Sequence, residues 1–133
     1  MAKRYVLEAG SVDVRRQLRI GRIATSRLSA IEVASALARR EREGAFTAAE
    51  RDRGLKRLND DLVAWILVEL TAELGGAAQG LLVRHGLRSG DAVQLASCLY
   101  LQREVGQRVT FAAFDDQLNA AARLEGLSLL PFA

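Results

Sequence analysis

Short β-prone segments alternate with longer segments of helical period along this chain, and this alternation constrains the fold more than any other feature. The β-prone segments are Arg22 to Ser26, Leu62 to Val68, Arg108 to Phe114 and Leu127 to Leu130. Strands that alternate with helices build a parallel sheet, so we predict an α/β fold. The predicted helices are Ser11 to Leu18, one from Ser29 to a stop at Gly44, one from Thr47, Thr71 to Arg84, one capped by Ser89 or Asp91, and Asp116 to Glu125.

Local signals mark several of these boundaries. Ser29 stands three residues before Glu32, which is the spacing of a capping box at a helix start. Thr47 is expected to open the next helix, and Gly86 follows the end of a later one. The run Leu62 to Val68 is almost continuously apolar, which is typical of a strand buried on both faces.

Length and composition exclude several classes of protein. With 133 residues the chain has the size of one domain, so we expect a single domain over residues 1–133. The lone cysteine, Cys98, excludes an internal disulfide and a cysteine-rich zinc site, and we expect it to be structural. No apolar run approaches the roughly 20 residues of a membrane span, and Met1 to Gly10 lacks the apolar stretch of a signal peptide. We therefore expect a cytoplasmic protein.

Charge is distributed unevenly. Residues 1–57 carry 14 basic and 7 acidic side chains, whereas residues 58–133 carry 5 basic and 9 acidic ones. Most of the basic residues are Arg, whose planar fork suits phosphate contacts. A GC-rich genome would also produce an Ala-, Arg- and Leu-rich chain. A basic half beside an acidic half is nevertheless compatible with a metal-dependent nuclease.

Carboxylates are the remaining candidates for chemistry. The chain has no phosphate-binding glycine loop and no nucleophile elbow, and its single histidine, His85, is expected to be an exposed residue at a helix end. Glu32, Asp91 and Asp115 each stand at or near the start of a predicted helix. In a parallel α/β sheet such positions meet at one edge, where they can hold a hard cation such as Mg²⁺. The alternative is that each carboxylate only caps its helix.

Three stretches of this chain resemble motifs of the PIN-domain family, and in particular of the VapC-type toxins of bacterial toxin–antitoxin pairs. The most specific is His85 to Ala96, with Gly90-Asp91-Ala92 at its centre. The stretch Thr25 to Leu37 looks like the earlier acidic motif, and Val109 to Leu118 looks like the late one. The resemblance implies a three-layer α/β sandwich in which helices flank a parallel sheet.

The same resemblance implies a function. Glu32, Asp91 and Asp115 match family positions that hold Mg²⁺ or Mn²⁺. The implied activity is endonucleolytic cleavage of RNA, with the metal activating a water and stabilising charge on the phosphate. A cognate antitoxin that blocks the site and a homodimer are also implied.

Two departures from the family pattern stand out. The family opens with a strand that ends in an Asp, whereas Lys3 to Ser11 looks like the segment that follows this strand, so we expect the first strand and the first acidic residue to be absent. Ala113 replaces the hydroxyl residue that usually stands two positions before the late Asp. The alternative function is therefore a catalytically inactive or truncated PIN-fold protein that binds an antitoxin or RNA. A phosphoryl-transfer signalling domain is disfavoured, because it needs a lysine beside its acceptor Asp and only Lys3 and Lys56 exist.

Overall fold

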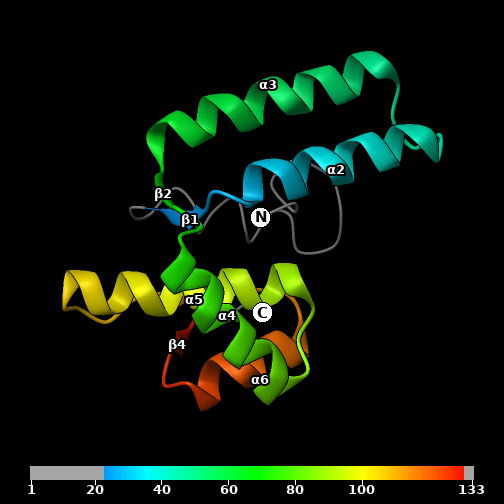
Figure 1. The fold of residues 1–133 in the computed structure, drawn as a ribbon. Coiled ribbons are helices and arrows are strands. Elements are labelled where there is room, and N and C mark those ends of the chain that lie inside the picture. Colours follow the sequence, from blue (N-terminus) through cyan, green and yellow to red (C-terminus); the bar gives the residue numbers. More distant parts are fainter. Residues whose placement is uncertain (1–22, 131–133) are drawn as a thin grey trace. The chain divides into compact units, whose positions relative to one another are not determined.

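A computed structural model of the chain describes residues 23–130, which belong to two compact units that meet in sequence between Leu67 and Val68. The elements along the chain (Figure 1) are β1 (Ala24–Ser26), α2 (Ser29–Arg42), α3 (Ala48–Ala64), β2 (Ile66–Val68), α4 (Ala72–His85), α5 (Ser89–Val105), β3 (Thr110–Phe111), α6 (Asp116–Leu124) and β4 (Ser128–Leu129). Helices and short strands in this order confirm the predicted α/β class. The helix expected at Ser11–Leu18 lies outside the described residues, and the single domain stays a prediction.

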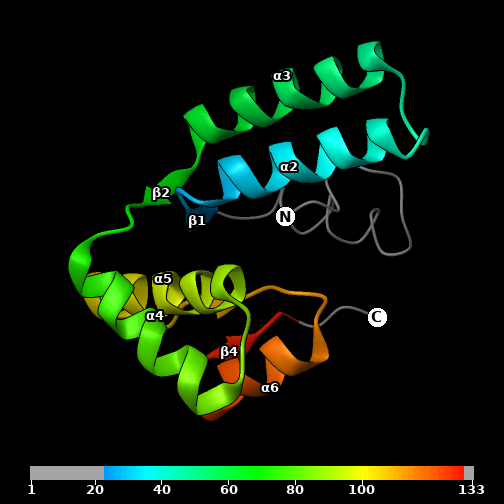
Figure 2. The same ribbon diagram turned by 45° about the vertical axis from the view of Figure 1, so that its right-hand side comes forward.

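The first unit contains an α-helical hairpin. Helices α2 and α3 lie side by side in both ribbon views (Figures 1 and 2) and bury Val33, Leu37 and Leu58 between them. Gly54 allows this close approach, since a Cβ at its position would lie 3.1 Å from the methyl groups of Leu37. Thr47 caps α3 as predicted: its hydroxyl accepts a hydrogen bond from the Glu50 amide, and the Glu50 carboxylate accepts one from the Thr47 amide.

The capping box predicted at Ser29 is wrong. Helix α2 has Leu28 at its N-cap and no side-chain capping hydrogen bond, so Ser29 already lies inside the helix. The Ser29 hydroxyl is buried and lies 2.6 Å from the Thr25 hydroxyl, while Ser26 Oγ accepts a hydrogen bond from the Leu28 amide. These buried hydroxyls bind one another and the chain before the helix, because a buried hydroxyl without a partner would be costly.

The long buried strand predicted over Leu62 to Val68 is also wrong. Helix α3 continues to Ala64. Leu62 packs against the apolar core between α2 and α3, and Val63 is 90% exposed. The strand covers only Ile66–Val68, and the Ile66 amide donates to the Ile23 carbonyl (3.0 Å) where β2 pairs with β1. A short apolar run satisfies a helix end and a strand equally well, so its period alone does not distinguish them.

The second unit joins helices α4, α5 and α6 to a pair of strands. Gly86 ends α4 in the left-handed conformation (φ +66°), as the sequence predicts. Strands β3 and β4 pair in parallel, with Thr110 opposite Ser128 and Phe111 opposite Leu129, and are shorter than the segments predicted for them. Helices α4 and α5 pack closely through buried Leu and Ala side chains. Within residues 23–130, no helix is long and apolar enough to cross a membrane.

Candidate metal centre

Asp91 lies in the first turn of α5. The residue at the N-cap is Arg88, whose backbone is extended, and no side chain makes a capping hydrogen bond there. The prediction that Ser89 or Asp91 caps this helix is therefore wrong. The buried side chains of Ala92, Leu95 and Ala96 hold this end of α5 in the core, so the position of Asp91 is set by packing rather than by a cap.

Asp115 is the N-cap of α6, as the sequence predicts. Its Oδ1 accepts a hydrogen bond from the Leu118 amide at 2.8 Å. The side-chain amide of Asn119 donates to the Ala113 carbonyl at 3.0 Å, which ties the first turn of the helix to the segment before it. The Asp115 carboxylate is exposed, and only one of its oxygens is used by the cap.

The two aspartates act on each other electrostatically. Partial burial raises the pKa of Asp91 above its ordinary value, the negative charge of Asp115 raises it further, and the positive charge of Arg88 opposes both. Two carboxylates that repel one another in this way are stabilised by a cation between them. Their oxygens are the hard ligands that Mg²⁺ and Mn²⁺ take, so the chemistry of this pair fits a divalent cation.

Glu32, the third predicted ligand, belongs to the other unit. It lies in the first turn of α2 and is exposed. Within the described residues of each unit taken alone, no group of three His, Cys, Asp or Glu side chains lies close enough to hold a metal. The structure therefore places Asp91 and Asp115 close enough for the charge of one to act on the other, and a shared metal site with a contribution from Glu32 stays a prediction.

His85 differs from its prediction. The sequence predicts an exposed residue at a helix end, whereas the His85 side chain is only 10% exposed. Its Nε2 lies 2.7 Å from Oε2 of Glu125. The hydrogen bonds from His85 and from Arg84 hold the pKa of Glu125 below its usual range. His85 therefore joins the end of α4 to Glu125, the C-cap of α6.

Cys98 has the properties expected of a structural cysteine. Its side chain is partly buried, and burial raises the pKa of its thiol to about 11. The thiolate, which is the nucleophilic and metal-binding form, is therefore scarce at neutral pH.

Sequence reasoning missed the roles of Arg88 and Gln117. Arg88 is exposed and is the cation whose charge acts on Asp91. Gln117 donates hydrogen bonds from its side chain to two backbone carbonyls at the end of α4. Both residues lie inside the motifs that carry the carboxylates, but no local pattern distinguishes them from ordinary surface residues.

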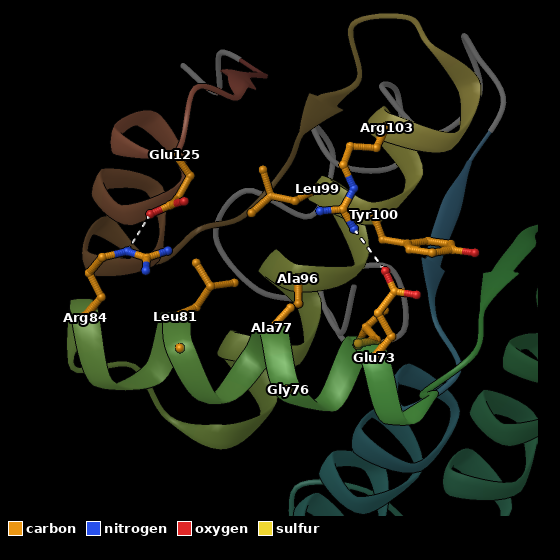
Figure 3. A pocket seen from close by; sticks show the side chains of 12 residues that line it. Glu73, Gly76, Ala77, Leu81, Arg84, Ala96, Leu99, Tyr100, Arg103 and Glu125 are labelled. Carbon is orange, nitrogen blue, oxygen red and sulfur yellow. Dashed lines mark hydrogen bonds and ion pairs between the residues drawn. The ribbon is translucent and has the colours of Figure 1, made fainter.

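A shallow hollow of about 280 Å³ lies elsewhere on the second unit (Figure 3). Helix α4 supplies Gly76, Ala77 and Gly80 to it, and α5 supplies Leu99 and Tyr100. Two ion pairs stand at its edges, Arg84 with Glu125 and Arg103 with Glu73 (Figure 3). None of the predicted metal ligands lines this hollow.

The fold and the carboxylate pair define an α/β protein whose acidic candidate centre suits a divalent metal. Compared with known protein families, the chain matches the PIN domain over residues 6–124. This match covers most of the chain, so the protein belongs to the PIN-domain family, a family of nucleases that are typically metal-dependent. A search among curated proteins finds no significant match.

Proposed function

We propose that this protein is a metal-dependent endoribonuclease of the VapC toxin type. In this proposal Asp91, Asp115 and Glu32 are the ligands of Mg²⁺ or Mn²⁺. The observation that carries it is the placement of Asp91 and Asp115, at the starts of two helices, where the charge of one raises the pKa of the other. Membership of a nuclease family that uses divalent metals supports the same assignment.

In this proposal two carboxylates of the second unit bind the metal and an arginine of the same unit binds the RNA. A bound divalent cation supplies Lewis acidity, which activates water and stabilises charge that develops on a phosphate. Asp91 and Asp115 would hold that cation through their carboxylate oxygens. Arg88, exposed beside Asp91, donates hydrogen bonds to a phosphate of the RNA backbone.

The toxin assignment extends to partners. A toxin of this type acts on RNA in the cytoplasm and needs a cognate antitoxin to block its carboxylate site. It is also expected to form a homodimer. These expectations rest on the resemblance of the motif around Asp91 to those of VapC-type toxins.

A second candidate is an inactive PIN-domain protein that binds an antitoxin or RNA without cutting it. The observation in its favour is the small number of ligands, because the described residues of the second unit bring only two carboxylates together. Two carboxylates bind a divalent cation weakly unless substrate phosphates complete its coordination.

An RNA cleavage assay on the purified chain separates the two candidates. The assay is run with Mn²⁺ or Mg²⁺, with EDTA, and with the variants Asp91→Ala and Asp116→Ala. Asp116 is the matched control, since it is an exposed carboxylate directly after Asp115. Cleavage that disappears with EDTA and with Asp91→Ala, but survives Asp116→Ala, supports the nuclease. A folded chain that leaves RNA intact under every condition supports the inactive protein.

A further inference from the structure

The start of α6 is attached to the end of α4 by one side chain. Gln117 Nε2 donates to the carbonyl of Gly86 at 3.1 Å and is 3.3 Å from the carbonyl of His85. Gly86 is held in the left-handed conformation at the C-cap of α4, where its amide donates to the Leu82 carbonyl. The Gln117 amide therefore binds a point of the backbone whose conformation is already set.

These hydrogen bonds connect the two chain segments that carry the carboxylates of Asp91 and Asp115. Gln117 lies two residues after Asp115, within the first turn of α6, and Gly86 lies five residues before Asp91, in the short connection to α5. The hydrogen bonds of Gln117 thus link the segment that leads into Asp91 to the helix turn that begins at Asp115.

We infer that Gln117 is a positioning residue that fixes the separation of the Asp91 and Asp115 carboxylates and so sets the affinity of the site for a divalent cation. The inference rests on the proposed function, because it assigns those carboxylates to a metal. Gln117 itself binds only backbone and touches neither carboxylate in any contact described for it.

Loss of this side chain leaves α6 in place. Leu118, Ala121 and Ala122 stay buried, and Glu125 still accepts hydrogen bonds from His85 and Arg84 at the other end of the helix. Gln117 is exposed, so replacing it buries no polar group without a partner. A variant at this position is therefore expected to fold and to differ in the first turn of α6.

The test compares Mn²⁺ binding by the original full chain with that by two variants, Gln117→Met and Gln79→Met. Electron paramagnetic resonance of free Mn²⁺ measures the binding. Methionine matches the length of glutamine and donates no hydrogen bond. Gln79 is the matched control, an exposed glutamine on α4. Residues behind metal ligands typically change affinity by 10–100-fold, and we expect about tenfold weaker binding for Gln117→Met and no change for Gln79→Met.

A double variant distinguishes positioning from a general structural effect. If Gln117 acts through Asp115, then Gln117→Met changes the affinity of Asp115→Asn protein much less than that of the original chain. Equal losses in both backgrounds would overturn the inference, as would unchanged Mn²⁺ binding in Gln117→Met.

A metal-free measurement keeps the inference separate from the proposed function. Residual dipolar couplings of backbone amides report the orientation of α6 relative to α5 within the second unit. In Gln117→Met we expect the couplings of residues 116–119 to change while those of α5 stay the same. If the original chain binds no Mn²⁺, the proposed function fails, and the dipolar couplings alone then test whether Gln117 positions the start of α6. Unchanged couplings then overturn the positioning role, and changed couplings support it.

Discussion

Asp115 has two roles that substitution can separate, because it is both the cap of α6 and a charge beside Asp91. Asparagine caps a helix about as well as aspartate, so Asp115→Asn keeps the hydrogen bond to the Leu118 amide and removes only the charge. The lost charge weakens an interaction with the helix dipole of about 0.3–1 kcal/mol, while the relief of repulsion on Asp91 acts in the opposite direction. We therefore expect the free energy of unfolding to change by less than about 0.5 kcal/mol.

Asp115→Ala removes both the charge and the cap. The 2.8 Å hydrogen bond to the Leu118 amide is lost, and N-cap substitutions of this kind cost about 1 kcal/mol. Both variants lose a proposed metal ligand, so both should bind Mn²⁺ at least about tenfold more weakly, since even residues behind ligands produce losses of that size. The pair therefore predicts weaker metal binding in both variants but a marked loss of stability in Asp115→Ala alone.

Urea unfolding followed by circular dichroism measures the stability of the two variants, provided that the dependence on urea stays the same. Mn²⁺ titration measures the affinity. The reasoning about the cap fails if Asp115→Asn is destabilised as strongly as Asp115→Ala. The assignment of Asp115 as a ligand fails if Asp115→Asn binds Mn²⁺ as tightly as the original chain.

Three further predictions concern the same unit. Because the fold raises the pKa of Asp91, its ionised form destabilises the folded state above its folded pKa, and this effect vanishes below its unfolded value of about 3.9. Asp91→Asn should therefore be more stable than the original chain in urea at pH 7, with no advantage at pH values below about 3.9. Arg88→Gln should weaken RNA binding and make the slope of log affinity against log salt shallower by about 0.7, and an unchanged slope would exclude a phosphate contact. Leu95→Ala, at a fully buried position, should cost about 2–5 kcal/mol in urea unfolding, whereas exposed Val83→Ala should cost less than about 0.5.

Two capping-box patterns in this chain show what local sequence can and cannot predict. Ser29 with Glu32 and Thr47 with Glu50 have the same spacing, yet only the second pair forms the box. Thr47 is exposed and free to bind the helix end, whereas the Ser29 hydroxyl is buried beside Thr25. The choice between them depends on burial, which the pattern does not contain.

In the candidate site, too, some features were predictable from the sequence and others were not. The role of Asp115 as a cap was predictable because it depends on a residue three positions along the chain. The burial of His85 was not, because Glu125 lies 40 residues away and meets it only once α6 packs. The influence of Asp115 on Asp91 likewise requires two helix starts, separated by the whole of α5, to lie near each other.

By itself, the sequence determined the α/β alternation, most helix ends and the acidic residues that the motifs contain. These depend on side-chain period, turn residues and capping, all of which act within a few positions of the chain. Only the tertiary structure decided which hydroxyls were buried, where the apolar run around Leu62 changed from helix to strand, and which carboxylates came together. Those outcomes depend on contacts between distant segments, because burial and charge repulsion arise only when the helices pack against one another.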